Sequence, residues 1–531
     1  MRSRTVGAVS ALESISRAAV RMMRAAVVVF VPAAVAATAA TAATVLRAQG
    51  GARPVLITGA LVYDGTGAAP RRADVRMMNG RIAAVGALSR SGRDSVVEAR
   101  GLALSPGFID THSHHDWGLD SARDARAAVS QGITTIVVGQ DGGSNVPLRT
   151  FFTKMASAPA TVNVASYAGH GTLRAQVMGK DFKRMASDPE IAKMRALFRD
   201  DLAAGALGLS SGLEYDPGIY STTAELVALA RDAAAVGGRY ISHMRSEDRA
   251  FWGAVDELLT IGRMAKIPVQ LSHMKLAQRS LWGRTDTLTR LLERARKDGI
   301  DVTADIYPYT FWQSTITVLF PDRDFQVRSS AEYALTEVTS PEGLLISRFA
   351  PEPSYEGKTL AEIAKLRGTD GPATLMDLIK LTKDGELDEG IIAVSMAEAD
   401  VTKLIAWPWA NICSDGTLFG RHPRGWGSFT KVLAMARASG APKLETLIHK
   451  MTGLSAHNVG ITGRGRIAVG MAGDLVLFDP ATVSDKATPK APMAPSVGIK
   501  GVWVNGALVY DGVKATAARP GQVIRRSARH R

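Results

Sequence analysis

Two histidines one residue apart, His112 and His114, close a short apolar run in SPGFIDTHSHHD, residues 105–116. In a strand, residues i and i+2 point to the same face, so both imidazoles are predicted to project to one side where the strand stops. Such a pair can hold a metal ion. A catalytic zinc needs about three protein ligands and an open position, so further ligands are expected at other strand ends.

Eight apolar segments alternate with helix-like stretches through the middle of the chain, which is typical of a parallel sheet with crossover helices. Eight is the strand number of a (β/α)8 TIM barrel. The segments are GFIDTHSH, ITTIVVGQD, NVASYAGHG, GALGLSSGL, GRYISHM, PVQLSHMK, DVTADIYPY and ANICSDGT. The gap before the eighth is too long for one loop, so we predict an insertion with its own helices over the active face.

Both ends of the folded part are rich in short strands with hairpin turns. PVLITGALVYDGTGAAPRRADVRMMNGRIAAVG comes early, and GDLVLFDP and GIKGVWVNGALVYDG come late. We predict an α/β fold with a small β-sandwich built from both ends; two unrelated β pieces are the alternative. The predicted division is a signal peptide (1–49), β-sandwich (50–108), catalytic barrel (109–460) with an insertion (310–408), β-sandwich (461–520) and a basic tail (521–531).

The charge of the chain argues against a nucleic-acid partner. The formal net charge is +14 over 531 residues, but residues 1–50 and 519–531 each carry +5, which leaves about +4 for the body. So small an excess of positive charge does not indicate a basic stripe that could bind nucleic acid. The single cysteine, Cys413, excludes an internal disulfide framework and a cysteine-based zinc knuckle.

The N-terminal segment is predicted to be an export signal. Arg17, Arg21 and Arg24 precede an Ala-rich apolar run with small residues suited to cleavage. A periplasmic or secreted protein without stable membrane insertion after cleavage is expected. An uncleaved anchor is the alternative, because the run is almost long enough to span a bilayer.

Polar side chains that suit a metal stand at the ends of five of the eight segments. Their recurrence at the carboxyl ends of a predicted barrel indicates one shared site. They are His112 and His114, Asp141, His243, His273, and Asp415. Imidazole and carboxylate favour zinc, with manganese or iron as alternatives.

The chain resembles the amidohydrolase superfamily, and within it the N-acyl-D-amino-acid deacylase (D-aminoacylase) family, from about Pro54 to Arg526. Beyond PGFIDTHSH, the resemblance rests on QGITTIVVG, GHGTLR, GALGLSSGLEYDPG, YISHMRSE, LSHMK, ADIYPYT, SDG followed by HPR and WG, and GRIAVGMAGDLVLFDP. It implies a metal-dependent (β/α)8 hydrolase with a small β-sandwich.

The resemblance also implies how one or two zinc ions are held. His243 and His273 would hold the tight metal, and His112 and His114 a second, weaker one. Where the family has a cysteine in a pattern like GNCGFS, this chain has GQDGGS, which places Asp141 at the cysteine position. A carboxylate can bridge two metals as a thiolate does, but it is a harder ligand. Glu214 is an alternative ligand.

Amide hydrolysis needs a nucleophile at neutral pH and a protonated leaving amine. Zinc lowers the pKa of bound water to about 7. By chemistry and by resemblance, Asp415 would take the proton of the water and deliver it to the leaving nitrogen. The resemblance further implies that Lys275, Tyr307 and Arg424 bind the α-carboxylate of the substrate, and Ser314 is expected to help bind the acyl oxygen.

The expected substrate is a small N-acyl amino acid, with D configuration implied by the resemblance alone. Thr310 to Gln313 offer no cation for an acidic side chain, which favours neutral or apolar side chains; lid packing is the other interpretation of these residues. One alternative is another C–N hydrolase acting on dipeptides, N-acyl-L-amino acids or cyclic amides, although no lysine ends the fourth segment to favour cyclic amides. A catalytically silent exported binding protein is the other. A homo-oligomer is compatible with the sequence.

Overall fold

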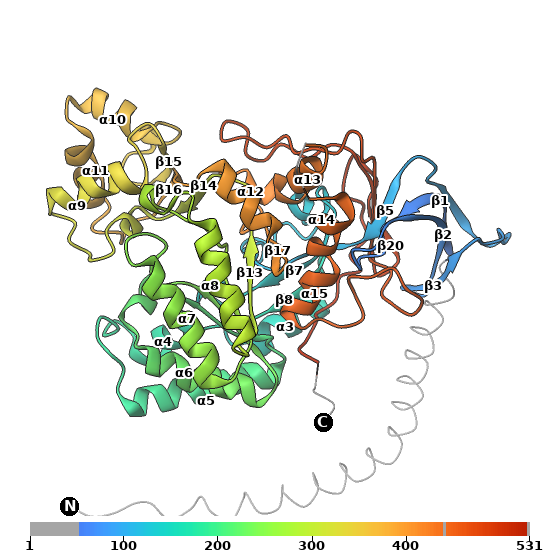
Figure 1. The fold of residues 1–531 in the computed structure, drawn as a ribbon, viewed down its shortest axis with the longest axis horizontal. Coiled ribbons are helices and arrows are strands. Elements are labelled where there is room, and N and C mark those ends of the chain that lie inside the picture. Colours follow the sequence, from blue (N-terminus) through green and yellow to red (C-terminus); the bar gives the residue numbers. More distant parts are fainter. Residues whose placement is uncertain (1–52, 439–441, 528–531) are drawn as a thin grey trace, which may run out of the picture. The chain divides into compact units, whose positions relative to one another are not determined.

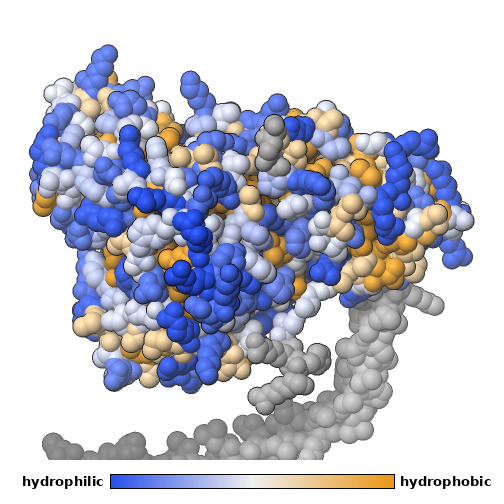
Figure 2. Space-filling model, viewed as in Figure 1, coloured by the Kyte–Doolittle hydropathy of each residue, from blue (hydrophilic) through white to orange (hydrophobic). Residues whose placement is uncertain are grey.

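The structure is a computed structural model that describes residues 53–438 and 442–527. The predicted signal peptide therefore lies outside the described residues, as does the end of the basic tail. Residues from Val55 onward form one compact unit. Within the described ranges, no helix is both long enough and apolar enough to cross a bilayer. Figure 2 shows a face on which hydrophilic side chains surround smaller apolar areas.

Strands from both ends of the chain share one eight-stranded sheet. Its order is β20-β19-β18-β5-β1-β2-β3, with β4 beside β1. The bounds are β1 (Val55–Val62), β2 (Arg71–Met78), β3 (Arg81–Gly86), β4 (Ser95–Glu98), β5 (Ala103–Pro106), β18 (Leu475–Phe478), β19 (Ile499–Val504) and β20 (Ala507–Tyr510). Buried and more exposed residues alternate along these strands: on β2, Ala73, Val75 and Met77 are buried, and the charged residues between them are more exposed. They pack in a common core with Leu475 and Trp503.

Each of the eight predicted barrel segments contains a strand, and every pairing among these strands is parallel. They form two sheets, β6-β7-β8 and β17-β13-β12-β11-β10-β9. The bounds are β6 (Phe108–Asp110), β7 (Ile133–Val138), β8 (Asn163–Ser166), β9 (Ala168–Gly169), β10 (Gly208–Gly212), β11 (Arg239–His243), β12 (Val269–Leu271), β13 (Val302–Ile306) and β17 (Ala410–Ile412). The third segment is divided at Tyr167 into β8 and β9.

Helices fill the connections between these strands and follow the last of them, and Figure 1 shows several, among them α5 to α8, around the parallel strands. They are α2 (Arg126–Val129), α3 (Leu148–Ser157), α4 (His170–Met178), α5 (Asp188–Ala204), α6 (Thr223–Ala235), α7 (Phe251–Ala265), α8 (Thr285–Lys297), α12 (Glu398–Ala406), α13 (Arg424–Met435), α14 (Leu444–Met451) and α15 (Gly453–Val459). Local sequence sets their ends. α5 begins with a capping box between Ser187 and Glu190 and stops at Gly205, whose φ of 112° a side chain would disfavour.

The segment 310–408 holds more than the predicted helices. Its helices are α9 (Arg328–Tyr333), α10 (Leu360–Arg367), α11 (Gly371–Leu381) and α12, and it also holds an antiparallel sheet, β14-β16-β15, that the sequence did not indicate. These strands are β14 (Phe311–Ser314), β15 (Leu344–Phe349) and β16 (Glu389–Val394). β14 follows β13 closely, so this sheet begins beside the carboxyl ends of the parallel strands.

Candidate active site

The six predicted metal ligands lie together at the carboxyl ends of five parallel strands. His243 is the last residue of β11, and the others follow the ends of β6, β7, β12 and β17. The site is thus assembled from segments that are distant in sequence. Its donor atoms form two groups that share one residue: His112, His114, Asp141 and Asp415 in one, and Asp141, His243 and His273 in the other. Within each group the donor atoms lie within 4.8 Å of one another.

The histidine pair does not lie on a strand. β6 ends at Asp110, two residues before His112, and β12 likewise ends two residues before His273. The prediction that strand alternation aligns His112 with His114 was therefore wrong, although both imidazoles do face Asp141. Loops align them, because backbone hydrogen bonds of 2.8 and 2.9 Å join the loop after β6 to the loop after β17.

Asp141 lies between the two groups and offers one oxygen to each. Its Oδ2 lies 3.3 Å from Nε2 of both His112 and His114. Its Oδ1 lies 3.4 Å from Nε2 of His273 and has no hydrogen-bond partner among the described residues. A half-buried carboxylate with one oxygen toward each group, whose Oδ1 is buried and unpartnered, suits a ligand that bridges two cations.

The second group carries two carboxylates of its own. Glu214 Oε2 lies 2.9 Å from His243 Nε2, and Glu247 Oε1 lies 3.1 Å from His273 Nδ1. Glu214, which the sequence offered as an alternative ligand, is thus in contact with a predicted ligand. Glu247 was missed; its one signal is its place four residues after His243 in YISHMRSE.

Burial and neighbouring charges shift the pKa values of His114 and Asp415 in opposite directions. Burial by itself disfavours the imidazolium of His114, yet Asp141 and Asp415 raise its pKa to about 9. Burial would raise the pKa of Asp415, yet Arg424 and the neighbouring imidazoles hold it well below its usual range. Carboxylates and imidazoles packed this closely form a donor set that a divalent cation fits, since it would replace the protons that pair them.

Three of the six residues have backbones in the left-handed region: φ is 51° at Asp141, 32° at His273 and 48° at Asp415. Such conformations cost roughly 1–3 kcal/mol each outside glycine, and they persist only where the surroundings fix them. His273 N donates to Asp305 Oδ1 at 2.6 Å. A Cβ on Gly212 would lie 2.2 Å from the carbonyl oxygen of Asp141, so only glycine fits there. The fold thus holds these ligands in place at some conformational cost.

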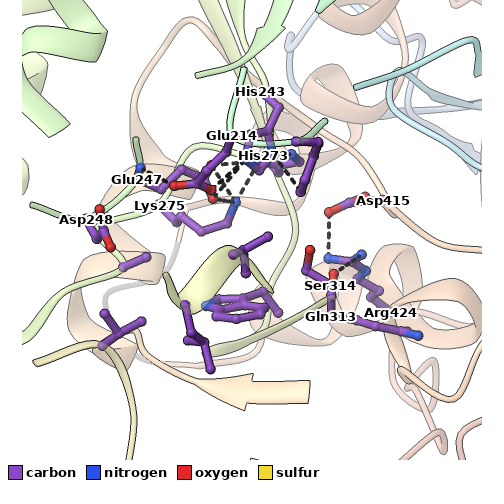
Figure 3. A pocket seen from close by; sticks show the side chains of 16 residues that line it. Glu214, His243, Glu247, Asp248, His273, Lys275, Gln313, Ser314, Asp415 and Arg424 are labelled. Carbon is purple, nitrogen blue, oxygen red and sulfur yellow. Dashed lines mark hydrogen bonds and ion pairs between the residues drawn. The ribbon is translucent and has the colours of Figure 1, made fainter. Parts of the chain in front are cut away.

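The cations predicted to bind a carboxylate are already paired with acids. Lys275 Nζ lies 2.7 Å from both oxygens of Glu247, and Arg424 lies 2.5 Å from Asp415 Oδ2. Figure 3 shows them on two sides of one pocket. Tyr307 lies beside Arg424, whose Cζ is 5.0 Å from the tyrosine ring centre, and its hydroxyl has no partner among the described residues.

Comparison with known proteins agrees with this geometry. Residues 95–510 match the Amidohydrolase family. The chain belongs to the amidohydrolase family. It is 36% identical over 500 residues to a D-aminoacylase of Alcaligenes xylosoxydans xylosoxydans, which covers 89% of this chain and 98% of the relative. It is 38% identical over 496 residues to an N-acyl-D-aspartate deacylase of the same organism, covering 88% and 94%.

A solved structure gives the same result for this amidohydrolase. The N-acyl-D-glutamate deacylase of Bordetella bronchiseptica, complexed with zinc and a phosphonate inhibitor that mimics the tetrahedral intermediate, superposes with a TM-score of 0.80 at 35% identity. The match covers 89% of this chain and 99% of that one. The resemblance read from the motifs is confirmed.

Two cavities meet at the centre of the amidohydrolase site. The small one, about 40 Å³, lies over His243, His273 and Lys275. The large one, about 660 Å³, lies over His114 and Asp141. Five residues line both cavities: Tyr215, Gln313, Ser314, Asp415 and Arg424. Ser314 thus lies at the junction, where the sequence predicted contact with the acyl group.

Proposed function

We propose that this protein is a zinc-dependent deacylase that hydrolyses N-acyl-D-amino acids to a carboxylate and a free amino acid. The observation that carries the proposal is the convergence of four imidazoles with Asp141 and Asp415 at the junction of two cavities. The near full-length relatives named above, a D-aminoacylase and deacylases of N-acyl-D-amino acids, supply the reaction class.

The donor set would hold one or two zinc ions. His243, His273 and Asp141 would hold the first, and His112 and His114, with Asp141 shared, the second. The Bordetella relative is complexed with zinc, which supports the choice of metal. Zinc bound there would supply a Lewis acid for the acyl oxygen and would lower the pKa of a water molecule to about 7.

Asp415 would move the proton in this reaction. Its Oδ1 lies 3.4 Å from His114 Nε2, at the edge of the donor set, and its Oδ2 is fixed by Arg424. The carboxylate takes one proton from water, whose oxygen bonds to the carbonyl carbon. The same proton then passes to the amide nitrogen as the C–N bond breaks, so that water is added across the amide.

The amino-acid part of the substrate would occupy the small cavity. Lys275 and Arg424 face it from two sides and would bind the α-carboxylate, with Tyr307 beside Arg424 as a third donor, in competition with their acidic partners. The apolar part of the wall comes mainly from the 310–408 segment, in Trp312, Val318, Leu319 and Val338. A neutral or apolar side chain is therefore favoured over an acidic one. Ser314 would bind the acyl oxygen.

We also propose the finer architecture expected from the sequence. The two parallel sheets would form one (β/α)8 barrel, supported by Ser414 N donating to Asp110 Oδ1 at 2.8 Å between the ends of β6 and β17. The mixed sheet of both chain ends would form a β-sandwich. The predicted domain boundaries and a periplasmic or secreted location remain part of this proposal.

An assay of the zinc-reconstituted protein tests the function. N-acetyl derivatives of D- and L-methionine, leucine, phenylalanine and glutamate are compared with X-Gly dipeptides and cyclic amides. We expect turnover of the D-derivatives, with neutral side chains ahead of glutamate. Turnover of L-substrates or cyclic amides without any D-substrate would refute the proposal.

A further inference from the structure

We propose that the large cavity binds the acyl part of the substrate and that this acyl group is of peptide type, so that the enzyme cleaves short peptides or acylated dipeptides ending in a D-residue. The inference rests on the proposed function, since it assigns the second side of the same reaction centre. Three properties of the cavity carry it: its position, its size and its lining.

The position follows from what the two cavities share. The small cavity contains Lys275 and the apolar wall, which suit the carboxylate and side chain of the released amino acid. Asp415 and Ser314 line both cavities, so the scissile amide is expected at their junction. Figure 3 shows Gln313, Ser314 and Asp415 together on one side of the small pocket. The acyl group then extends into the other cavity, over His114.

The size is far beyond what a simple acyl group needs. The large cavity measures about 660 Å³, against about 40 Å³ on the amino-acid side. A cavity volume of this kind needs to be only roughly 10–15 Å³ to hold one water molecule, so the three heavy atoms of an acetyl group fill only a small part of the large cavity. Most of the cavity is left for atoms beyond the carbonyl.

The lining distinguishes a peptide from a hydrocarbon chain. Among the described residues around the large cavity there is no aliphatic side chain, whereas the small one has several. Its aromatic lining includes Trp117 and Phe419, which are 65% and 60% exposed. The lining also contains uncharged polar groups of Gln140, Thr315, Ser347 and Thr417, and the charged side chains of Arg348, Glu389 and Arg421. Aromatic platforms with adaptable polar groups recur where proteins bind peptide surfaces.

The aromatic pair is built into the site. The Trp117 ring lies 5.2 Å from the ring of His114, centre to centre, so this wall begins at a proposed metal ligand. A Cβ on Gly118 would lie 2.8 Å from the Phe419 ring, so glycine allows that ring to pack close. An amide of the substrate can lie against these rings while its N–H and C=O pair with the polar groups. An alkyl chain would leave those polar groups unpaired. Unpaired polar groups discriminate between two ligands more strongly than a missing apolar contact does.

Three substrates of the wild-type zinc enzyme test the inference: N-acetyl-, N-pentanoyl- and N-(acetylglycyl)-D-leucine. The last two have acyl chains of equal length and differ in one amide against two methylenes. We expect kcat/KM for the acetylglycyl compound to exceed the values for both others about tenfold, mainly through KM. Equal or faster cleavage of the pentanoyl compound, or no gain over acetyl, would overturn the inference while leaving the proposed function intact.

Failure of all three D-substrates with zinc bound would refute the proposed function itself, so the two failures are distinguishable.

Phe419→Ala should lower the ratio of acetylglycyl to acetyl kcat/KM about fivefold, and an unchanged ratio would contradict the assigned lining. The matched control is Leu366→Ala, because Leu366 is 66% exposed and lines neither cavity. The ratio of acetylglycyl to acetyl kcat/KM should not change in Leu366→Ala. The comparison of wild-type substrates stands even if Phe419→Ala does not fold.

Discussion

The two halves of the metal site differ in how firmly their histidines are held. In the closed half, over the small cavity, His243 and His273 contact Glu214 and Glu247 in addition to Asp141. In the open half, His114 depends on Asp141 and Asp415 and faces the large cavity. The side chains of His243 and His273 are 4% and 2% exposed, whereas in the open half His112 is fully buried and His114 is 15% exposed.

Outer carboxylates fix the orientation of ligating imidazoles and raise their basicity. The closed half has two such carboxylates of its own, Glu214 and Glu247, at 2.9 and 3.1 Å. In the open half only His112 faces one, Asp305, at the longer distance of 3.7 Å, and His114 shares its acids with the proton-transfer step and the bridge. We therefore infer that the closed half binds zinc more tightly and that the open half exchanges it more easily. The resemblance implied the same order, and the contacts supply a physical reason for it.

The largest expected effect concerns Asp415, the proposed proton-transfer residue, which lines both cavities. Asp415→Asn keeps the size of the side chain but removes the base, so kcat should fall about 10³-fold, within the range of general acid–base catalysis. Zinc content, measured by elemental analysis, should stay unchanged. Retained hydrolysis would show that Asp415 does not transfer the proton.

Replacing one histidine in each half tests directly whether the two halves bind zinc with different affinities. His243→Asn should remove the tightly held zinc and about 10²-fold to 10³-fold of kcat/KM, because the closed half loses a ligand. His114→Asn should lower the affinity of the second zinc only and cost less activity. Titration with a chelator, read as zinc per chain, separates the two. Equal losses in both variants would contradict the order of affinities.

Glu247 tests whether outer carboxylates cause the difference. Glu247→Gln removes the charge that faces His273 Nδ1 and Lys275, so zinc affinity of the closed half should fall by about 10-fold to 100-fold. The matched control is Glu257→Gln, whose carboxylate pairs with Arg245 outside both cavities. If both variants hold zinc equally well, Glu247 has no part in tuning the metal.

The resemblance implies that Asp141 stands where the family has a cysteine, and a smaller effect is expected from changing it. Asp141→Cys restores a thiolate, which zinc accepts, so activity should stay within about tenfold while zinc affinity rises. Asp141→Asn serves as the comparison, since it removes the bridging charge without adding a thiolate. If neither substitution changes the zinc content, Asp141 is not the bridging ligand.

Part of this site could be predicted from sequence, and the rest could not for definite physical reasons. Strand-forming runs that end in His243 or Asp415 are local signals, and the parallel order of strands brings their ends together. Neither Glu247 nor Asp305 gave such a signal. Glu247 lies in a loop, where a carboxylate is usually solvated, and Asp305 lies within β13 and not at its end. The pairing of Lys275 with Glu247 depends on three-dimensional contact alone. The β14-β16-β15 sheet was missed because its strands are far apart in sequence.

The last prediction uses a buried charge outside both halves. Lys450 on α14 is 2% exposed, and its Nζ donates to the carbonyls of Trp407 and, at 3.0 Å, Ala410. No acid pairs with it among its described contacts, in contrast to the cations of the active site. Burial lowers the pKa of Lys450 from 10.5 to about 7.

Between pH 7 and 10.5 the unfolded chain therefore binds a proton that the folded protein lacks, so this lysine makes the folded state more stable as pH rises. The contribution approaches about 1.4 kcal/mol per pH unit in the middle of that window. Lys450→Met should remove this slope from urea unfolding free energies measured at pH 7.5 to 9.5, with zinc held constant, whatever its effect on absolute stability. An identical slope in both proteins would mean that Lys450 stays protonated when buried, held by its carbonyl partners as the active-site cations are held by carboxylates.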